Sequence, residues 1–68
     1  MKTLKLKKYK YGTHGNLRSL TDDYAVKSEK VIEFYSFKKS DKTGTVVVTD
    51  GGQHYCKNTF NDVAKQVG

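Results

Sequence analysis

The chain contains one cysteine, one arginine and no proline. Because Cys56 is the single cysteine, no disulfide can form within the chain. No apolar run approaches the roughly 20 residues that a membrane-spanning helix needs, and no apolar segment of a secretory signal follows Met1. These absences predict a cytoplasmic protein that makes no contact with a membrane.

No linker-like segment, internal repeat or low-complexity stretch divides the 68 residues. We therefore expect residues 1–68 to form one small basic domain. A domain of this size buries only about 60% of the surface of its unfolded chain, which leaves little core in which to build a catalytic pocket. The length favours a binding protein over an enzyme.

Basic residues outnumber acidic ones by thirteen to seven, which gives a formal net charge of +6 and a pI of about 9.5. All the basic residues except Arg18 are lysines. A lysine is a hydrated point charge that attracts phosphates, whereas arginine offers the planar fork that reads guanine. The charge predicts nucleic acid or an acidic protein as the partner. Lysine enrichment is also typical of AT-rich genomes and of small soluble proteins. Composition alone therefore does not decide whether the lysines bind a partner or are incidental.

Residues 31–57 carry the clearest strand signals. Val31–Lys39 is rich in β-branched and aromatic residues, and Thr45–Thr49 is a run of five β-branched residues. Such residues lose side-chain freedom in a helix and little in a strand. The segment SDKTG (40–44) predicts the first turn. In Asp-Gly-Gly (50–52), either Asp-Gly or Gly-Gly can form the tight hairpin turn that leads into a short strand over 53–57.

The first eleven residues alternate as a strand does, with Leu4 and Leu6 on one side. Tyr9 and Tyr11 are out of phase with these leucines. A bulge near Lys7 and Lys8 would restore the register; without a bulge, the tyrosines stand on the solvent face among the lysines. If the segment is an edge strand, its lysines would also discourage edge-to-edge aggregation, which is the structural alternative to a binding role.

Residues 12–16 predict a loop because they contain two glycines and an asparagine. Residues 17–28 are ambiguous. Leu17, Leu20 and Tyr24 have helical spacing, whereas Tyr24-Ala25-Val26 can begin a strand. The sequence does not decide whether this segment is helix, strand or loop, although a short helix is the weak preference.

The C-terminal segment changes to a helical period. Phe60, Val63, Ala64 and Val67 form one apolar stripe, and Thr59 is suited to cap the helix. TFNDVAKQVG (59–68) resembles the first helix of the helix-turn-helix in LacI-type repressors, over ten residues. No recognition helix follows these ten residues, so we assign no family and expect the stripe to pack on the sheet.

These elements together predict an α+β fold with a three- to four-stranded antiparallel sheet (a β-meander) and one C-terminal helix. We expect Ile32 and Phe34 to belong to the core and Tyr35 to remain partly accessible.

Residue types that commonly act in catalysis or metal binding are few in this chain. His54 and Cys56 lie two apart on one strand face, and His14 is distant. Zinc usually needs four ligands in two close pairs, so we expect no metal site. We also expect no catalytic residue and no cofactor, with Cys56 a small buried residue facing the helix.

The remaining signal is the interleaving of lysines with tyrosines. Lysines attract phosphates, and aromatic rings on a sheet can stack on bases. We therefore expect a small accessory protein that binds nucleic acid mainly through backbone phosphates, with low sequence specificity. The alternative is a protein-binding module, such as a phage-like inhibitor or adaptor that docks on an acidic or strand-edge partner. The candidate nucleic-acid-binding residues are Lys5, Lys7, Lys8, Tyr9, Lys10, Tyr11, Tyr35, Lys38, Lys39 and Lys42.

Overall fold

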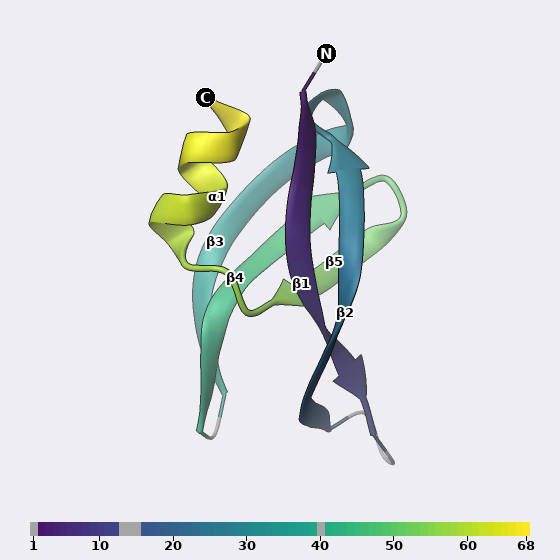
Figure 1. The fold of residues 1–68 in the computed structure, drawn as a ribbon, viewed down its shortest axis with the longest axis vertical. Helices are drawn as coiled ribbons and strands as arrows, with labels where there is room; N and C mark the ends of the chain where they lie inside the picture. Colours follow the sequence, from purple (N-terminus) through teal and green to yellow (C-terminus); the bar gives the residue numbers. More distant parts are fainter. Residues whose placement is uncertain (1, 13–15, 40) are drawn as a thin grey trace.

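The computed structural model describes residues 2–12, 16–39 and 41–68. Its antiparallel sheet has the strand order β2-β1-β5-β4-β3, and one helix follows the last strand (Figure 1). The expected α+β class is confirmed, but the sheet has five strands, not three to four. The elements are β1 (Thr3–Tyr11), β2 (Leu17–Lys27), the 3-10 turn η2 (Ser28–Lys30), β3 (Val31–Lys39), β4 (Lys42–Thr49), β5 (Gly52–Cys56) and α1 (Phe60–Val67).

The extra strand is β2, which occupies the segment for which the sequence weakly favoured a helix. It pairs with β1 in an antiparallel register that sets Leu4 opposite Val26 and Leu6 opposite Tyr24. This register places the apolar residues of both strands on one face, since paired residues share a face. The long-range pairing therefore overrides the helical spacing of the leucines.

The turns agree with the sequence in part. Lys39 pairs with Lys42, so β4 begins inside the expected turn 40–44, of which Ser40 lies outside the described residues. Thr49 pairs with Gly52, so the turn residues are Asp50-Gly51, the first of the two alternatives, and β5 begins and ends one residue earlier than the expected strand 53–57. The expected loop 12–16 includes residues 13–15, which are outside the described part of the chain.

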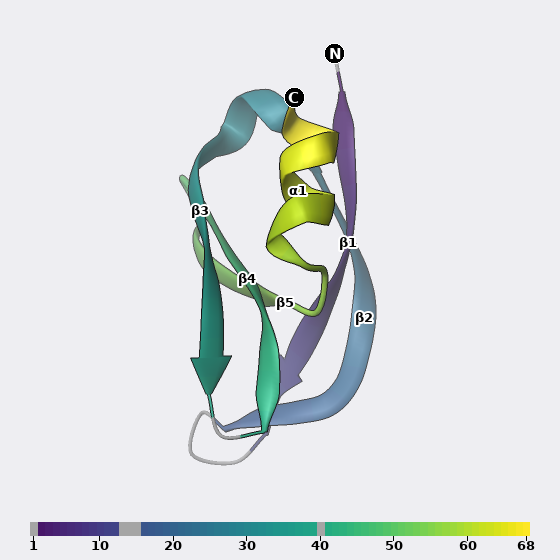
Figure 2. The same cartoon turned by 90° about the vertical axis from the view of Figure 1, so that its left-hand side faces the viewer.

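The helix α1 has the expected extent and cap, because the side-chain oxygen of Thr59 accepts a hydrogen bond from the Asp62 amide at 3.2 Å. Its stripe lies against a sheet that curves around it, with β3 and β1 on either side (Figure 2). The buried cluster consists of Leu4, Leu6, Val47, Cys56 and Val63.

Two expected core residues lie elsewhere. Ile32 is 69% exposed, because the register between β3 and β4 shifts between Val31 and Glu33 and the regular inward alternation is interrupted there. Phe60 is 44% exposed and contacts Phe34 at a ring-centroid distance of 5.1 Å. Phe34 packs against the core as expected, so Phe60 covers the edge of the core without entering it.

Candidate nucleic-acid interface

Aromatic side chains gather on the sheet face opposite α1. Tyr35 of β3 pairs with Val46 of β4, which in turn pairs with Tyr55 of β5. Because paired residues share a face, these three form one row across the sheet. Val46 is only 1% exposed although α1 lies on the other face, which fits a position between two tyrosines.

Two further rings contact Tyr55 of this row: Tyr11 from β1 and Phe37 from β3. Tyr11 and Tyr55 have centroids 6.4 Å apart with an interplanar angle of 87°, and Phe37 and Tyr55 lie 5.0 Å apart at 90°. Such edge-to-face pairs stabilise the arrangement and fix the orientation of the rings. We call this set the aromatic face; it consists of Tyr11, Tyr35, Phe37 and Tyr55.

The aromatic face remains partly accessible. Tyr11 is 49% exposed and Tyr35 is 41% exposed, while Phe37 and Tyr55 are half-buried. The Tyr35 hydroxyl accepts a hydrogen bond from the Gln53 side chain at 3.2 Å. Partial burial, together with the neighbouring Tyr55 and Cys56, raises the pKa of Tyr11, so its hydroxyl stays protonated at neutral pH.

Sequence reasoning missed Phe37. The available signal was the alternation along Val31–Lys39, which places Phe37 on the same side as Tyr35.

Tyr9 does not belong to the accessible surface, contrary to the sequence prediction. Its side chain is 6% exposed, its ring packs edge-on against Phe37 at 6.2 Å, and its hydroxyl donates to the Thr43 carbonyl at 3.0 Å. The register between β1 and β2 shifts between Tyr9 and Tyr11, and the bulge near Lys7 and Lys8, one of the two alternatives, is not present. Tyr9 is buried because the curved sheet brings β3 and β4 against β1.

The candidate lysines divide between the two faces of the sheet. Lys5 and Lys7 alternate with Leu4 and Leu6, so they point away from α1, as does Lys39, which alternates with Phe37 on β3. Lys39 Nζ lies 5.8 Å from the centroid of the Tyr55 ring, a cation–π geometry.

Lys8 and Lys10 point to the opposite side. Lys8 is paired with Cys56, and its Nζ lies 5.4 Å from the centroid of the Tyr24 ring. Lys10 Nζ lies 3.4 Å from an Asp22 carboxylate oxygen. Lys38 alternates with Phe37 and therefore also lies off the aromatic face.

Three of the seven candidate lysines form ion pairs. Besides Lys10, Lys7 pairs with Asp23, and Lys42 pairs with Asp41 at 3.0 Å. The contact with Lys7 holds the pKa of Asp23 below its ordinary value, chiefly through the hydrogen bond. Among the described residues, the other four candidates, Lys5, Lys8, Lys38 and Lys39, form no ion pair.

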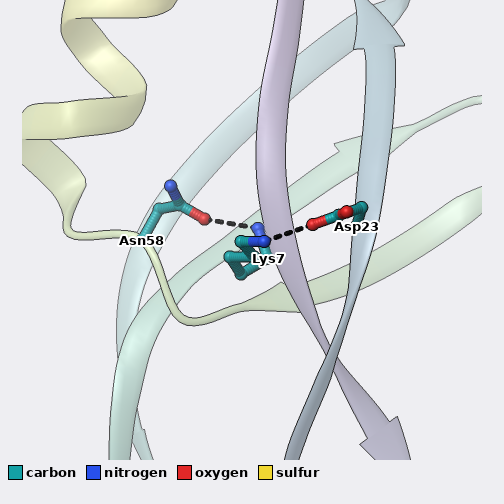
Figure 3. Close-up of polar contacts among 3 residues, drawn as sticks. All are labelled: Lys7, Asp23 and Asn58. Atoms are coloured by element: carbon teal, nitrogen blue, oxygen red, sulfur yellow. Dashed lines mark hydrogen bonds and ion pairs between the residues drawn. The ribbon is translucent and has the colours of Figure 1, made fainter.

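Lys7 is held from both sides of β1 (Figure 3). Its ammonium group faces Asp23 of β2, and its backbone amide donates to the Asn58 side-chain oxygen at 2.7 Å. A shallow groove lies here, lined by Lys5, Lys7, Asp23, Ala25 and Asn58 among others. The paired Lys7 is therefore a weaker anion attractor than Lys5, which forms no ion pair with a described residue.

His54 and Cys56 serve the packing on the α1 side. His54 stacks on Tyr24 at 4.9 Å, and its Nε2 shares a hydrogen bond with the Thr49 hydroxyl at 3.1 Å. Burial, with a contribution from Lys8, lowers the pKa of His54, so the ring is neutral at pH 7. Burial raises the pKa of Cys56 to about 11, which keeps the thiol protonated and unreactive.

Across residues 2–12, 16–39 and 41–68, no three His, Cys, Asp or Glu side chains are placed to hold a metal ion. The second histidine, His14, lies outside that part of the chain. In the same part, no helix is long and apolar enough to cross a membrane.

The fold and the site define an α+β domain in which a C-terminal helix covers one face of a five-stranded antiparallel sheet and an aromatic face bordered by lysines lies on the other. No family model, curated protein or solved structure gives a significant match to the chain.

Proposed function

We propose that this protein binds nucleic acid, mainly through the backbone phosphates and with low sequence specificity. The observation that carries the proposal is that four of the seven candidate lysines are not neutralised in an ion pair: Lys5, Lys8, Lys38 and Lys39 form none with any described residue. With a net charge of +6, the surface attracts a polyanion over a long range. Binding suits this chemistry better than catalysis, because the thiol of Cys56 is protonated and buried.

Low specificity follows from the residue types. Base edges in a duplex are read best by side chains with paired donors or a donor and an acceptor. The charged candidate residues are all lysines, which act as point charges, and Arg18 is the single arginine of the chain. Binding by such lysines depends on the density of phosphate charge and does not discriminate between base sequences.

The test is a fluorescence-anisotropy titration of labelled oligonucleotides between about 25 and 200 mM salt. If about four lysines neutralise phosphates, the logarithm of affinity falls against the logarithm of salt with a slope of about −3 to −4. Lys39→Ala and Lys5→Ala should each weaken binding to all sequences alike and reduce the slope by about one.

Lys65→Ala is the matched control, since Lys65 lies exposed in the last turn of α1 and its loss changes the net charge equally. Equal weakening by the control would show that no particular surface is used. Absence of binding at about 50 mM salt would exclude the proposed function, because nonspecific attraction is strong there.

One observation favours a second candidate, a protein-binding module. β3 is the last strand of the sheet, and within the described chain nothing pairs with its outer edge. Its residue Ile32 is 69% exposed, which suits the addition of a strand from a partner protein. A failure of the oligonucleotide titration would leave this candidate in place.

A further inference from the structure

We infer that the occupant of the aromatic face is a single-stranded polynucleotide, whose bases stack on Tyr11, Tyr35 and Tyr55. This inference rests on the proposed function and deepens it, because it names the form of nucleic acid and the residues that discriminate it. DNA and RNA strands share the chemistry that the rings recognise, since every base has a π-face.

The rings are presented as a platform. Tyr35 and Tyr55 flank Val46 in one row, so their backbones stand roughly 10 Å apart, about twice the spacing of neighbouring strands. Tyr11 adds a third ring from β1 through its edge-to-face contact with Tyr55. Edge-to-face packing holds the rings of Tyr11 and Tyr55 in place before any ligand arrives, and the hydrogen bond from Gln53 orients Tyr35, which lowers the entropic cost of stacking.

A duplex cannot use this platform. Paired bases are stacked on one another and present only their edges in the grooves, whereas an unpaired strand exposes its base faces. The rings therefore add affinity for single strands alone. The lysines attract both forms of nucleic acid, so the discrimination comes from the aromatic residues.

The charge around the platform fits a strand whose phosphates lie along one side of the row of tyrosines. Alternation along β3 places Glu33, Tyr35, Phe37 and Lys39 on this face in that order. The carboxylate of Glu33 thus lies on one side of the row and the ammonium group of Lys39 on the other, where it stands over the Tyr55 ring. We expect the backbone of a bound strand to pass beside Lys39 and to avoid Glu33.

The test compares a labelled 12-nucleotide thymine strand, the matching uracil strand and a 12-base-pair duplex at about 50 mM salt. The protein should bind both single strands at least tenfold more tightly than the duplex. Tyr11→Leu and Tyr35→Leu should each weaken single-strand binding by about tenfold to a hundredfold and leave duplex binding within about twofold.

Phe60→Leu is the matched control, because Phe60 is a similarly exposed ring on the helix side of the sheet. Its binding should equal that of the unmodified protein. The chain has no tryptophan and five tyrosines, so quenching of intrinsic tyrosine emission on titration with the unlabelled thymine strand reports stacking directly. This quenching should be smaller in both tyrosine variants, and thermal melting verifies that each variant is folded.

The two proposals fail differently. Equal affinity for single strands and duplex, or single-strand binding that neither tyrosine variant changes, would overturn the inference and leave the proposed function intact. Absence of binding to all three probes would overturn the proposed function itself.

Discussion

At the scale of single residues, Gly44 decides whether β4 can approach the end of β5. A Cβ atom at this position would lie 1.9 Å from the carbonyl oxygen of Cys56, far inside any possible contact. The obstructing atom is backbone, so no side-chain movement can relieve the clash. The sequence presents this residue as an ordinary turn glycine, yet Gly44 lies within β4 and is needed because of a close backbone approach.

We therefore expect Gly44→Ala to lower the free energy of unfolding by more than about 3 kcal/mol, which is most of the stability of a domain this small. Gly51→Ala is the control, since its Cβ would meet the Thr49 hydroxyl at an ordinary 3.6 Å. Urea denaturation followed by circular dichroism measures both. A Gly44→Ala protein as stable as Gly51→Ala would show that β4 and β5 do not meet as described.

The burial of Tyr9 also belongs to this scale and shows where sequence reasoning ends. Alternation with Leu4 and Leu6 correctly places Tyr9 on the face away from α1. It cannot show that Phe37, distant in the chain, closes over that position. Burial depends on the curvature of the sheet, which local patterns do not encode.

At the scale of elements, α1 supplies hydrogen bonds to the backbone of β1 that a paired strand would otherwise make. The one residue pair between β1 and β5 is Lys8–Cys56 in the described chain. Farther along β1, the Gln66 side chain bonds the Lys5 backbone as a paired strand would. Its oxygen accepts from the Lys5 amide at 2.7 Å, and its nitrogen donates to the Lys5 carbonyl at 3.1 Å. Asp62 holds the Gln66 side chain through a further bond at 3.2 Å.

The apolar spacing and the Thr59 cap were sufficient to predict the bounds of α1, because both are local signals. The role of Gln66 was not predictable. A glutamine in a final helical turn is ordinary, and its partner Lys5 is 61 residues away. β2 was missed for a related reason, since its pairing with β1 depends on contacts across the hairpin and its internal spacing also suits a helix.

Gln66→Ala should lower the free energy of unfolding by about 1–2 kcal/mol, because both hydrogen bonds to Lys5 and the one to Asp62 are lost at a site that water can partly reach. Hydrogen exchange should locate the effect: the Lys5 amide loses its protection while amides paired between β3 and β4 keep theirs. The neighbouring exposed substitution Lys65→Ala should change stability by less than about 0.5 kcal/mol. Unaltered protection at Lys5 would contradict this account of the helix.

At the scale of the whole molecule, the positive charge is unevenly placed relative to the aromatic face. Three aspartates are occupied by Lys7, Lys10 and Lys42, whereas Glu33 forms no ion pair with a described residue. Glu33 points to the aromatic face and lies about 7 Å along β3 from Tyr35. This distance is within the Debye length of about 10 Å at 0.1 M salt, so the carboxylate repels a polyanion bound there.

Glu33→Lys should therefore strengthen binding of a single-stranded oligonucleotide by about threefold to tenfold at 50 mM salt and steepen the salt slope by about one, because a repulsion becomes a phosphate contact. Glu29→Lys in η2 makes the same change in net charge away from the aromatic face, and screening should limit its effect to less than about twofold. Titrations of both variants across the salt range, beside the unmodified protein, separate local from global charge. Equal gains for the two variants would mean that affinity depends only on the net charge of the protein, which is +6 before either substitution. The aromatic face would then have no special part in binding.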